Sequence, residues 1–465
     1  MPEYLTPGVY IEEIPKLPPS IASVETAIPA FIGYTEKAQL KEADDLRLKP
    51  KRITSMLEYE QYFGLALPET SITVTIDTSQ PNKIDVQGKV ATPSSYLMYY
   101  SLQMFFINGG GPCYIVSVGD YSGGGVIDRD ALKSGLDEVA KINEVTLILF
   151  PDGLKMSSAG NYYALHKEAL DQCAELKDRF VVMDVWIDPD TTVDNIEVLR
   201  NADFGTTDTA KYGAVYYPRI YCRLRYRVAD DSAVQIVGVG DGSLNGTLAE
   251  LQSKNNSYYF MAKGAINDIE MLLPASSAVV GKYAEVDNTR GVWKAPANIG
   301  IDYAIRPYRL VTHKDQASLN VDTSSGKSIN VIRSFPGRGP AIIWGARTLA
   351  GNDNEWRYIS VRRYFNMVEE STKNATEQFV FEPNDRNTWI RVKSMIENYL
   401  TQQWKAGALM GTTTREAFFV KVGLGETMTE LDILEGRMIV EIGLAVVRPA
   451  EFIILRFMHK MLQES

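Results

Sequence analysis

Residues 146–185 read TLILFPDGLKMSSAGNYYALHKEALDQCAELKDRFVVMDV and place one amphipathic stretch between two short apolar runs. The runs at 147–150 and 181–183 are apolar at every position. Strands of this kind are typical of a parallel sheet, because helices cover both of its faces. The stretch therefore predicts a strand at 146–150, a helix at 161–176 and a second strand at 180–185.

The same alternation continues on both sides of this stretch. Upstream, Thr92 and Pro93 form a helix-start signal, and the glycines at 109–111 should stop that helix. Ser276 or Ser277 is expected to cap a later helix that runs through residue 285. Further strands are expected at 113–118 and 214–217, and further helices at 130–142 and 192–201. The fold class is therefore α/β, with a mostly parallel sheet and helices on both faces.

The C-terminal part predicts a smaller α+β domain. A helix near residue 358 should turn Arg362, Arg363, Glu369 and Glu370 outward. A helix from about 388, a strand at 417–422, a short helix opened by Thr429 and a strand-like end at 438–457 should follow. The expected domains are an N-terminal linker arm at 1–20, an α/β core at 21–357 with a possible β-rich insertion at 40–90, and a C-terminal domain at 358–465 with a terminal strand arm at 448–465.

Composition limits the classes of function. The chain has 465 residues and a net charge of −10, which disfavours a general nucleic-acid binder. Its three cysteines form no CxxC pair, so they encode neither a disulfide framework nor a zinc ribbon. The N-terminus lacks the features of a signal peptide, and charges interrupt the apolar stretch 438–457, so we expect no membrane insertion. Basic residues concentrate at 302–363.

Motifs for catalysis or cofactor binding are incomplete. The run Ser325-Gly326-Lys327-Ser328 resembles the end of a phosphate-binding loop, but Val321 stands where that loop needs glycine. The glycines at 238 and 240 lack the third glycine of a dinucleotide fingerprint, and no Gly-x-Ser-x-Gly elbow is present. The histidines His166, His313 and His459 have no metal-ligand spacing. We therefore predict no catalytic residue, no cofactor and no metal; an α/β hydrolase or nucleotide-dependent protein is the enzyme alternative.

Both ends of the chain have strand character with no evident local partner. Residues 2–20 contain five prolines around the strand-like run 8–14, which argues for an extended arm. The stretch 449–458 ends in a strand-like alternation at Phe452, Ile454 and Arg456 close to the C-terminus. Unpaired strands of this kind favour β-augmentation, in which one chain completes a sheet in another. The alternative is that both ends pair within their own chain.

The order of several motifs resembles the contractile tail sheath proteins of bacteriophages, phage-tail-like bacteriocins and extracellular contractile injection systems. The similarity spans almost the whole chain apart from residues 40–90. The motifs are PGVYIEE at 7–13, NGGG at 108–111 followed by CYIV at 113–116, RGVWKAPAN at 290–298, IRSFPGRG at 332–339, WGARTL at 344–349, VRR at 361–363, FEPND at 381–385 and RPAEF at 448–452.

This resemblance implies a subtilisin-like topology for the α/β core and a C-terminal domain that faces an inner tube. It also implies that N- and C-terminal arms of neighbouring subunits complete a sheet in the C-terminal domain of a third. The residues expected to make the arm contacts are Val9, Tyr10, Ile11, Phe452, Ile454 and Phe457. The candidate charges for lattice or tube contacts are Arg362, Arg363, Glu430, Asp432 and Arg437.

The implied function is that of a structural subunit of a contractile sheath, which polymerises helically around an inner tube and contracts to drive it through a target envelope. The implied partners are further copies of the chain, the inner tube protein, and baseplate and terminal cap proteins, but no nucleic acid. Assembly is expected in the bacterial cytoplasm, as part of a phage tail or of a particle released from the cell. A baseplate or cap component of the same machine is the nearest alternative.

Overall fold

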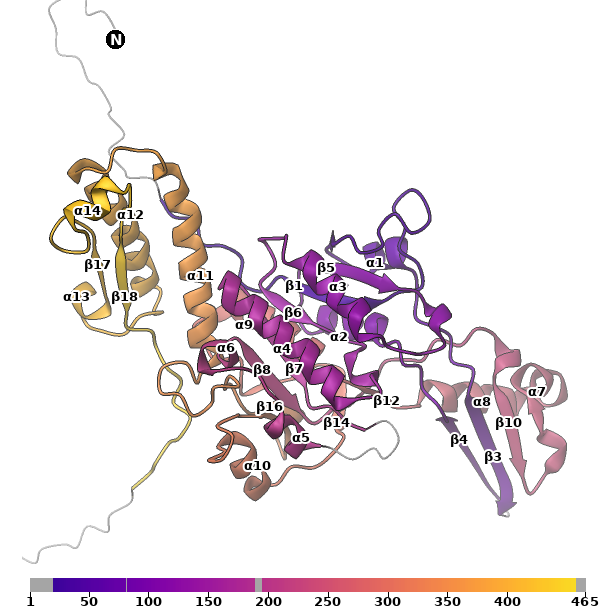
Figure 1. Ribbon diagram of the computed structural model, residues 1–465. Coiled ribbons are helices and arrows are strands. Elements are labelled where there is room, and N and C mark those ends of the chain that lie inside the picture. The colour runs from indigo at the N-terminus through magenta and orange to yellow at the C-terminus, as the bar shows by residue number, and fades with distance from the viewer. Residues whose placement is uncertain (1–19, 81, 189–194, 457–465) are drawn as a thin grey trace, which may run out of the picture. The chain divides into compact units, whose positions relative to one another are not determined.

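The computed structural model describes residues 20–80, 82–188 and 195–456, and the chain divides into two compact units (Figure 1). Of the described residues, the large unit holds 25–367 and 448–456, and the small unit holds 20–24 and 368–447. This division differs from the expected domains in three places. Residues 21–24 belong to the small unit instead of the α/β core, the later boundary falls at 367/368 instead of 357/358, and residues 448–456 belong to the large unit instead of the C-terminal one.

The large unit contains a nine-stranded mixed sheet. Its six central strands, from β15 to β5, are parallel, whereas β2, β16 and β13 pair antiparallel at the edges. In spatial order the strands are β13 (Ile299–Gly300), β16 (Gly339–Ile343), β15 (Asn330–Phe335), β8 (Gly213–Tyr217), β7 (Phe180–Asp184), β6 (Leu147–Leu149), β1 (Pro29–Tyr34), β5 (Cys113–Gly119) and β2 (Lys51–Ile53). The α/β class is confirmed, with a mixed sheet; the subtilisin-like topology stays a prediction.

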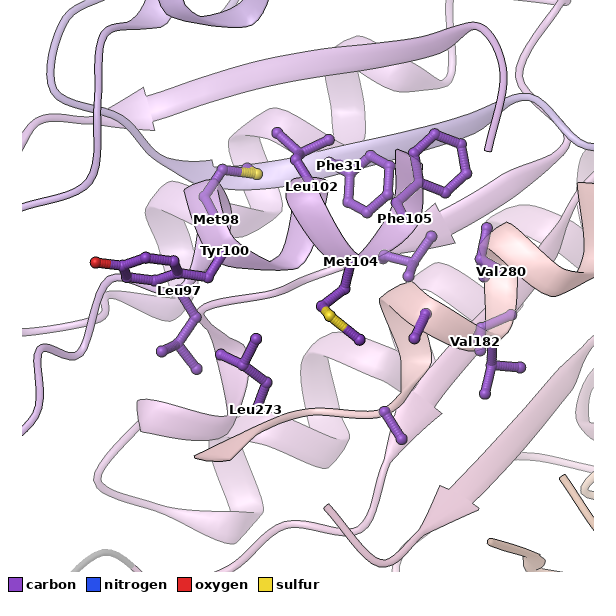
Figure 2. Packing of buried hydrophobic residues seen from close by; sticks show 14 of the residues in the cluster. Phe31, Leu97, Met98, Tyr100, Leu102, Met104, Phe105, Val182, Leu273 and Val280 are labelled. Carbon is purple, nitrogen blue, oxygen red and sulfur yellow. The ribbon is translucent and has the colours of Figure 1, made fainter. Parts of the chain in front are cut away.

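Consecutive residues of the central strands point to opposite faces of the sheet, and both faces are covered. On one face, Phe31 of β1 lies beside Phe105 of α2 (Met98–Ile107), with 5.2 Å between the ring centroids (Figure 2). Helix α9 (Ser276–Arg290) packs on the same core. On the other face, Ala30 and Ile32 pack in a second core with α3 (Arg129–Val139) and α4 (Ala159–Leu176). This arrangement explains why the strands are apolar at every position.

The starts of α2 and α9 differ from the prediction. Neither Thr92-Pro93 nor Ser276 or Ser277 caps a helix, because a buried carboxylate from the end of a parallel strand does so instead. Asp152, shortly after β6, accepts hydrogen bonds from the backbone N–H groups of Leu97 and Met98 at 2.5 and 3.1 Å. Asp184, at the end of β7, accepts from the N–H groups before and at the start of α9. The expected stop of α2 near Gly109 is confirmed.

The predicted insertion at 40–90 is not a separate module. Helix α1 (Met56–Phe63) packs in the core of the large sheet through Tyr59 and Phe63. Strands β3 (Ile72–Gln80) and β4 (Lys83–Val90) instead join β10 and β11, about 150 residues later, in a four-stranded sheet (Figure 1). Two later helices, α7 and α8, cover the apolar face of β3, which explains the pairing across such a long separation.

The other elements of the large unit are short. The remaining strands are β9 (Ile220–Cys222), β10 (Gln235–Val239), β11 (Gly246–Thr247), β12 (Met271–Leu273) and β14 (Ala304–Pro307). The remaining helices are α5 (Ile196–Asn201), α6 (Thr207–Ala210), α7 (Leu248–Lys254), α8 (Asn256–Asn267) and α10 (His313–Asn320). Strands β12, β9 and β14 form a three-stranded antiparallel sheet.

Of the described residues, the small unit holds 20–24, the end of α11 (Ile359–Thr376), a 3-10 helix (Glu377–Phe379), three further α-helices and two strands. The predicted helix from about 388 is α12, capped by Asp385, and Thr429 opens α14 with a capping box, as expected. The predicted strand at 438–457 is only four residues long. The bounds are α12 (Arg386–Lys405), α13 (Thr414–Ala417), β17 (Phe418–Lys421), α14 (Glu430–Leu434) and β18 (Glu441–Leu444).

Candidate assembly site

The small unit contains a two-stranded antiparallel ribbon formed by β17 and β18. The register places Phe418 opposite Leu444 and Lys421 opposite Glu441. Throughout the described ranges, these two strands form a sheet only with each other. Each strand therefore has one edge that no strand in that part of the chain covers. An edge of this kind is a template for a strand from another chain.

The small unit also carries many exposed apolar side chains for its size. The most exposed is Phe381, whose side chain is fully accessible to solvent and whose backbone has a positive φ of 69°. A positive φ is strained for a bulky residue and is found mainly where the conformation serves a function. The other exposed apolar residues are Val380, Ile390, Met410, Phe419, Leu424, Leu431, Leu434 and Ile439. Such a surface indicates contact with other proteins.

The last described segment of the large unit is an exposed apolar stretch. Residues 451–456 form no helix or strand, and the four large apolar side chains at 452–455 are exposed. Phe452 is 70% exposed and Ile454 is 78% exposed, and the two neighbours at 453 and 455 are comparable. These two predicted arm residues are therefore available for contact. The other four, Val9, Tyr10, Ile11 and Phe457, lie outside the described residues.

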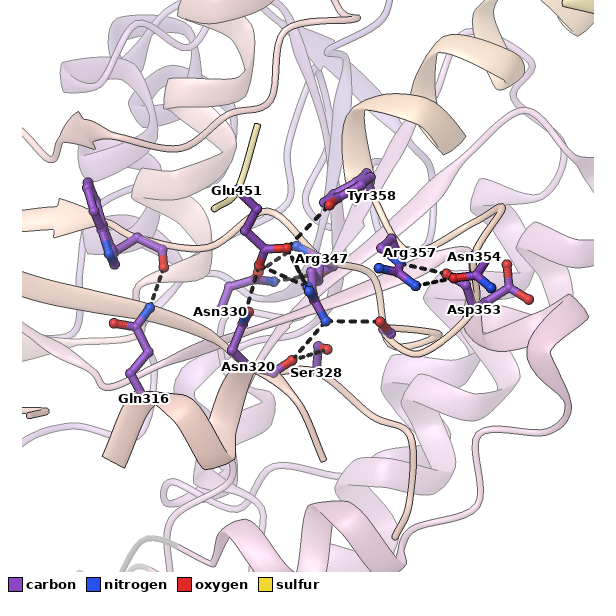
Figure 3. Close-up of polar contacts among 12 residues, drawn as sticks. Gln316, Asn320, Ser328, Asn330, Arg347, Asp353, Asn354, Arg357, Tyr358 and Glu451 are labelled. Atoms are coloured by element: carbon purple, nitrogen blue, oxygen red, sulfur yellow. Dashed lines mark hydrogen bonds and ion pairs between the residues drawn. The ribbon is translucent and has the colours of Figure 1, made fainter. Parts of the chain in front are cut away.

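Directly before this exposed segment, Glu451 is held by an ion pair (Figure 3). Its Oε2 lies 2.6 Å from Arg347 Nη2 and its Oε1 lies 3.0 Å from Arg347 Nε, which is a bidentate contact. Asn320 Nδ2 donates to the same carboxylate at 2.7 Å, and the Tyr358 hydroxyl donates at 3.3 Å. Burial raises the pKa of Glu451, but the bonds from Arg347 and Asn320 outweigh it and hold the pKa below its ordinary value.

Arg347 is itself fixed from several sides. Its side chain is 4% exposed, and its Nη1 donates to the carbonyl of Gly351 at 3.2 Å. Its backbone N–H donates to Asn330 Oδ1 at 2.7 Å, and Asn330 Nδ2 returns a bond to the Arg347 carbonyl at 2.8 Å. Asn330 also bonds the carbonyl of Val215 in β8. The backbone of Arg347 is thus tied through Asn330 to the parallel strands of the large sheet.

Two of the predicted contact charges are not on the surface. Arg362 is 2% exposed and Arg363 is 4% exposed, so their expected outward orientation is wrong. Arg363 pairs with Asp287 of α9, with 3.1 Å between Nη1 and Oδ1. Arg362 lies over the ring of Trp356 and donates to Asn366 at 2.8 Å. These contacts bury both guanidinium groups, and sequence periodicity gave no signal of the partners.

The other three predicted charges lie on or next to α14 and are at least partly exposed. Asp432 caps α14 through Thr429 and contacts Arg437 at 2.8 Å. Arg437 also lies 2.5 Å from Glu435, and its side chain is 56% exposed. Glu430 is exposed. The site residues that the sequence did not identify are Arg347 and Phe381; both stand in quoted motifs, but the partner of Arg347 is distant in the chain.

The motif that resembles a phosphate-binding loop has a structural role. Lys327 Nζ donates to the carbonyls of Arg200 and Ala202 at 2.5 Å and so caps the end of α5. Burial lowers the pKa of Lys327. The Ser328 hydroxyl donates to the carbonyl of Asn320 at 2.6 Å. With its lysine and serine engaged in this way, the loop presents no free phosphate-binding groups of that motif.

Whether histidine and cysteine side chains can serve metal or redox chemistry depends on their burial and grouping. His166 is buried on α4, and burial lowers its pKa to about 4. The three cysteines are free and buried. No three His, Cys, Asp or Glu side chains come together in a metal-binding arrangement in the part of the chain that the structure describes. None of the helices described is long and apolar enough to span a bilayer.

Comparisons with known proteins agree with this picture. Residues 351–459 match the model of the phage tail sheath C-terminal domain. The tail sheath protein of Vibrio phage KVP40 is 28% identical over 135 residues, which are 29% of this chain and 20% of that protein. The chain therefore matches about a fifth of the length of this phage relative.

Solved structures cover more of the chain. A protein of the extracellular contractile injection system PVC, in its contracted sheath complex, is 29% identical, with coverage of 98% of both chains and a TM-score of 0.64. The helical sheath of the anti-feeding prophage, also in the contracted state, is 30% identical and has a TM-score of 0.67. This second match covers 98% of the present chain and 100% of the sheath chain. A similarity of this extent shows that the chain belongs to the tail sheath protein family.

Proposed function

We propose that this chain is the structural subunit of a contractile sheath, which polymerises helically around an inner tube and contracts to drive that tube through a target envelope. The observation that supports this most is the pairing of two features in one chain. The small unit presents a ribbon with two open edges, and the large unit ends in exposed apolar residues. The open edges of the ribbon can accept a strand, and the exposed apolar segment of a neighbouring subunit can supply one.

In this proposal, the C-terminal arm at 448–465 and the N-terminal arm at 1–20 of neighbouring subunits add strands to the β17–β18 ribbon. A contact of this kind joins two different surfaces of the same protein, so its repetition generates an open helical assembly when the repeated rotation does not close into a ring. The small unit would serve as the tube-facing domain, and the large unit as the outer body. The arms keep subunits connected while the bodies rearrange during contraction.

The energetics fit a durable connection. Burial of a leucine, isoleucine or phenylalanine side chain contributes about 1.5–3 kcal/mol. The four exposed side chains at 452–455 therefore give each arm several kcal/mol, in addition to main-chain hydrogen bonds to the ribbon. By contrast, exposed ion pairs contribute at most about 1 kcal/mol each. Glu430, Asp432 and Arg437 are thus suited to weak contacts with the tube or lattice that can break.

The proposed partners are further copies of the chain, the inner tube protein, and the baseplate and cap proteins that end such a tube. The proposal assigns no catalysis and no cofactor to the chain. Assembly in the bacterial cytoplasm, followed by function in a phage tail or a released particle, belongs to the same proposal. A role restricted to the baseplate or cap would need few copies per particle, so the copy number distinguishes it from a sheath.

The test replaces Ile454 with aspartate in the full chain. We expect Ile454→Asp to remain folded and to form no sheath tubes in electron micrographs, because a charge in the new strand opposes its burial against the ribbon. The matched control is Leu310→Asp, since Leu310 is 80% exposed in the large unit but lies outside the arms. Normal tubes from Ile454→Asp, or loss of tubes in both variants, would overturn the proposed arm contact.

A further inference from the structure

The C-terminal arm contacts the large unit through a small number of side chains before it becomes exposed. The small unit ends at Val447, and the chain then returns to the large unit. Arg448 Nη1 donates to the carbonyl of Asn354 at 2.8 Å, and Glu451 enters the bidentate contact with Arg347. From Phe452 onward the described side chains are exposed. The chain thus changes from a segment bonded to the large unit to an exposed segment between Glu451 and Phe452.

The contact at Glu451 is stronger than a surface ion pair. Arg347 is 4% exposed and Glu451 is 21% exposed, so water screens their attraction poorly. A bidentate arginine–carboxylate contact also fixes the orientation of both groups. Asn320 and Tyr358 supply further donors to the same carboxylate (Figure 3). Such a site holds one backbone position while neighbouring residues remain free.

The contacts of Arg347 show what the arm is attached to. Through Asn330, the arginine is hydrogen-bonded to β15 and to the carbonyl of Val215 in β8, two parallel strands of the nine-stranded sheet. A force applied to the arm is therefore transmitted first to the nine-stranded sheet of the large unit and only then along the chain to β18 of the small unit. Without the anchor, residues 449–451 would become free chain as far back as Arg448, which adds about 10 Å of slack at 3.3 Å per residue.

We propose that Arg347 and Glu451 form an anchor that fixes the point where the C-terminal arm leaves the large unit and thereby sets the length of the link to the next subunit. This inference rests on the proposed sheath function. A link of defined length makes neighbouring bodies move together, whereas slack lets one subunit rearrange before the next. Glu451 acts here as a positioning residue, because it sets where the arm begins and leaves the apolar contacts to residues 452–455.

The first test measures the anchor in the unassembled full chain. Spin labels are placed at Phe452→Cys and at Leu57→Cys, which is 75% exposed on α1; the native cysteines are buried, so labelling is selective. We expect a narrow distance distribution in the parent protein, at least a twofold broadening with Glu451→Ala, and no change with Glu355→Ala, an exposed control. An equally narrow distribution in Glu451→Ala would overturn the anchor. If Glu451→Ala does not fold, Glu451→Gln serves instead, because it keeps the shape and removes the charge.

The second test asks whether the anchor matters in assemblies. Glu451→Ala should still form tubes, since its apolar arm residues are intact, but the fraction of partly contracted sheaths should rise severalfold over Glu355→Ala. Equal fractions in the two variants would overturn the role in coupling. If the parent chain forms no tubes, the proposed function fails, and the spin-label distances still decide whether the anchor exists.

Discussion

The ion pair between Arg363 and Asp287 shows that helical periodicity alone does not predict whether a charged residue faces solvent. A charged residue on an amphipathic helix is normally solvated, and on that basis Arg362 and Arg363 were expected to face outward. Arg363 instead meets a carboxylate 76 residues earlier in the chain, and both side chains are 5% exposed or less. Helical periodicity identifies the apolar face of α11 but contains no information about a distant partner.

Removal of Arg363 should destabilise the large unit strongly. Arg363→Ala leaves the carboxylate of Asp287 buried and unpaired, and loss of one partner of a buried pair costs about 3–5 kcal/mol. The measurement is the free energy of unfolding of the large unit in guanidinium chloride. Arg52→Ala is the matched control in the same unit, since its side chain is 42% exposed and its ion pair with Glu144 should contribute at most about 1 kcal/mol. Similar losses in both variants would contradict the buried pair.

For helices and strands, the sequence predicts the features that neighbouring residues determine. It misses the features that depend on residues distant in the chain. Strands β6, β7 and β8 were identified because each is a local apolar run, and α14 because its capping box lies within four residues. The predicted start of α2 at Thr92-Pro93 is wrong because the residue that caps the helix, Asp152, lies more than 50 residues later in the chain. The arm residues stand in strand-like ends of the chain that resemble those of sheath proteins, but the contact between Glu451 and Arg347 spans 104 residues.

The cap of α2 gives a prediction for that element. Asp152→Ala leaves the N–H groups of Tyr34, Leu97 and Met98 without an acceptor, which should lower the free energy of unfolding by about 1–3 kcal/mol. Hydrogen exchange should accelerate at the first amides of α2 before other parts of the large unit. Gly33 permits the close approach of this carboxylate, because a Cβ there would lie 2.4 Å from Asp152 Oδ2.

The control for the α2 prediction is Asp137→Ala on α3. Its side chain is 58% exposed, so the substitution should change stability by no more than about 0.5 kcal/mol. If exchange at the start of α2 is the same in Asp152→Ala and Asp137→Ala, the carboxylate is not the cap that the geometry indicates.

In the whole molecule, both units carry surfaces that are unsuited to an isolated chain. The small unit offers a ribbon with open edges, and the large unit releases four exposed apolar residues directly after an anchored glutamate. Neither feature could be located by composition, which is that of an ordinary globular protein. The resemblance of the motifs to sheath proteins indicates arms, and the fold shows that the exposed segment begins at Phe452.

A cryo-EM reconstruction of the polymer that this chain forms shows directly where the C-terminal segment pairs. We expect residues 452–456 of one subunit to run as a strand along an open edge of the β17–β18 ribbon in a different subunit. We also expect Glu451 to remain in contact with Arg347 of its own subunit. A polymer in which residues 452–456 pair within their own subunit, or remain exposed to solvent, would contradict the proposed arm contact.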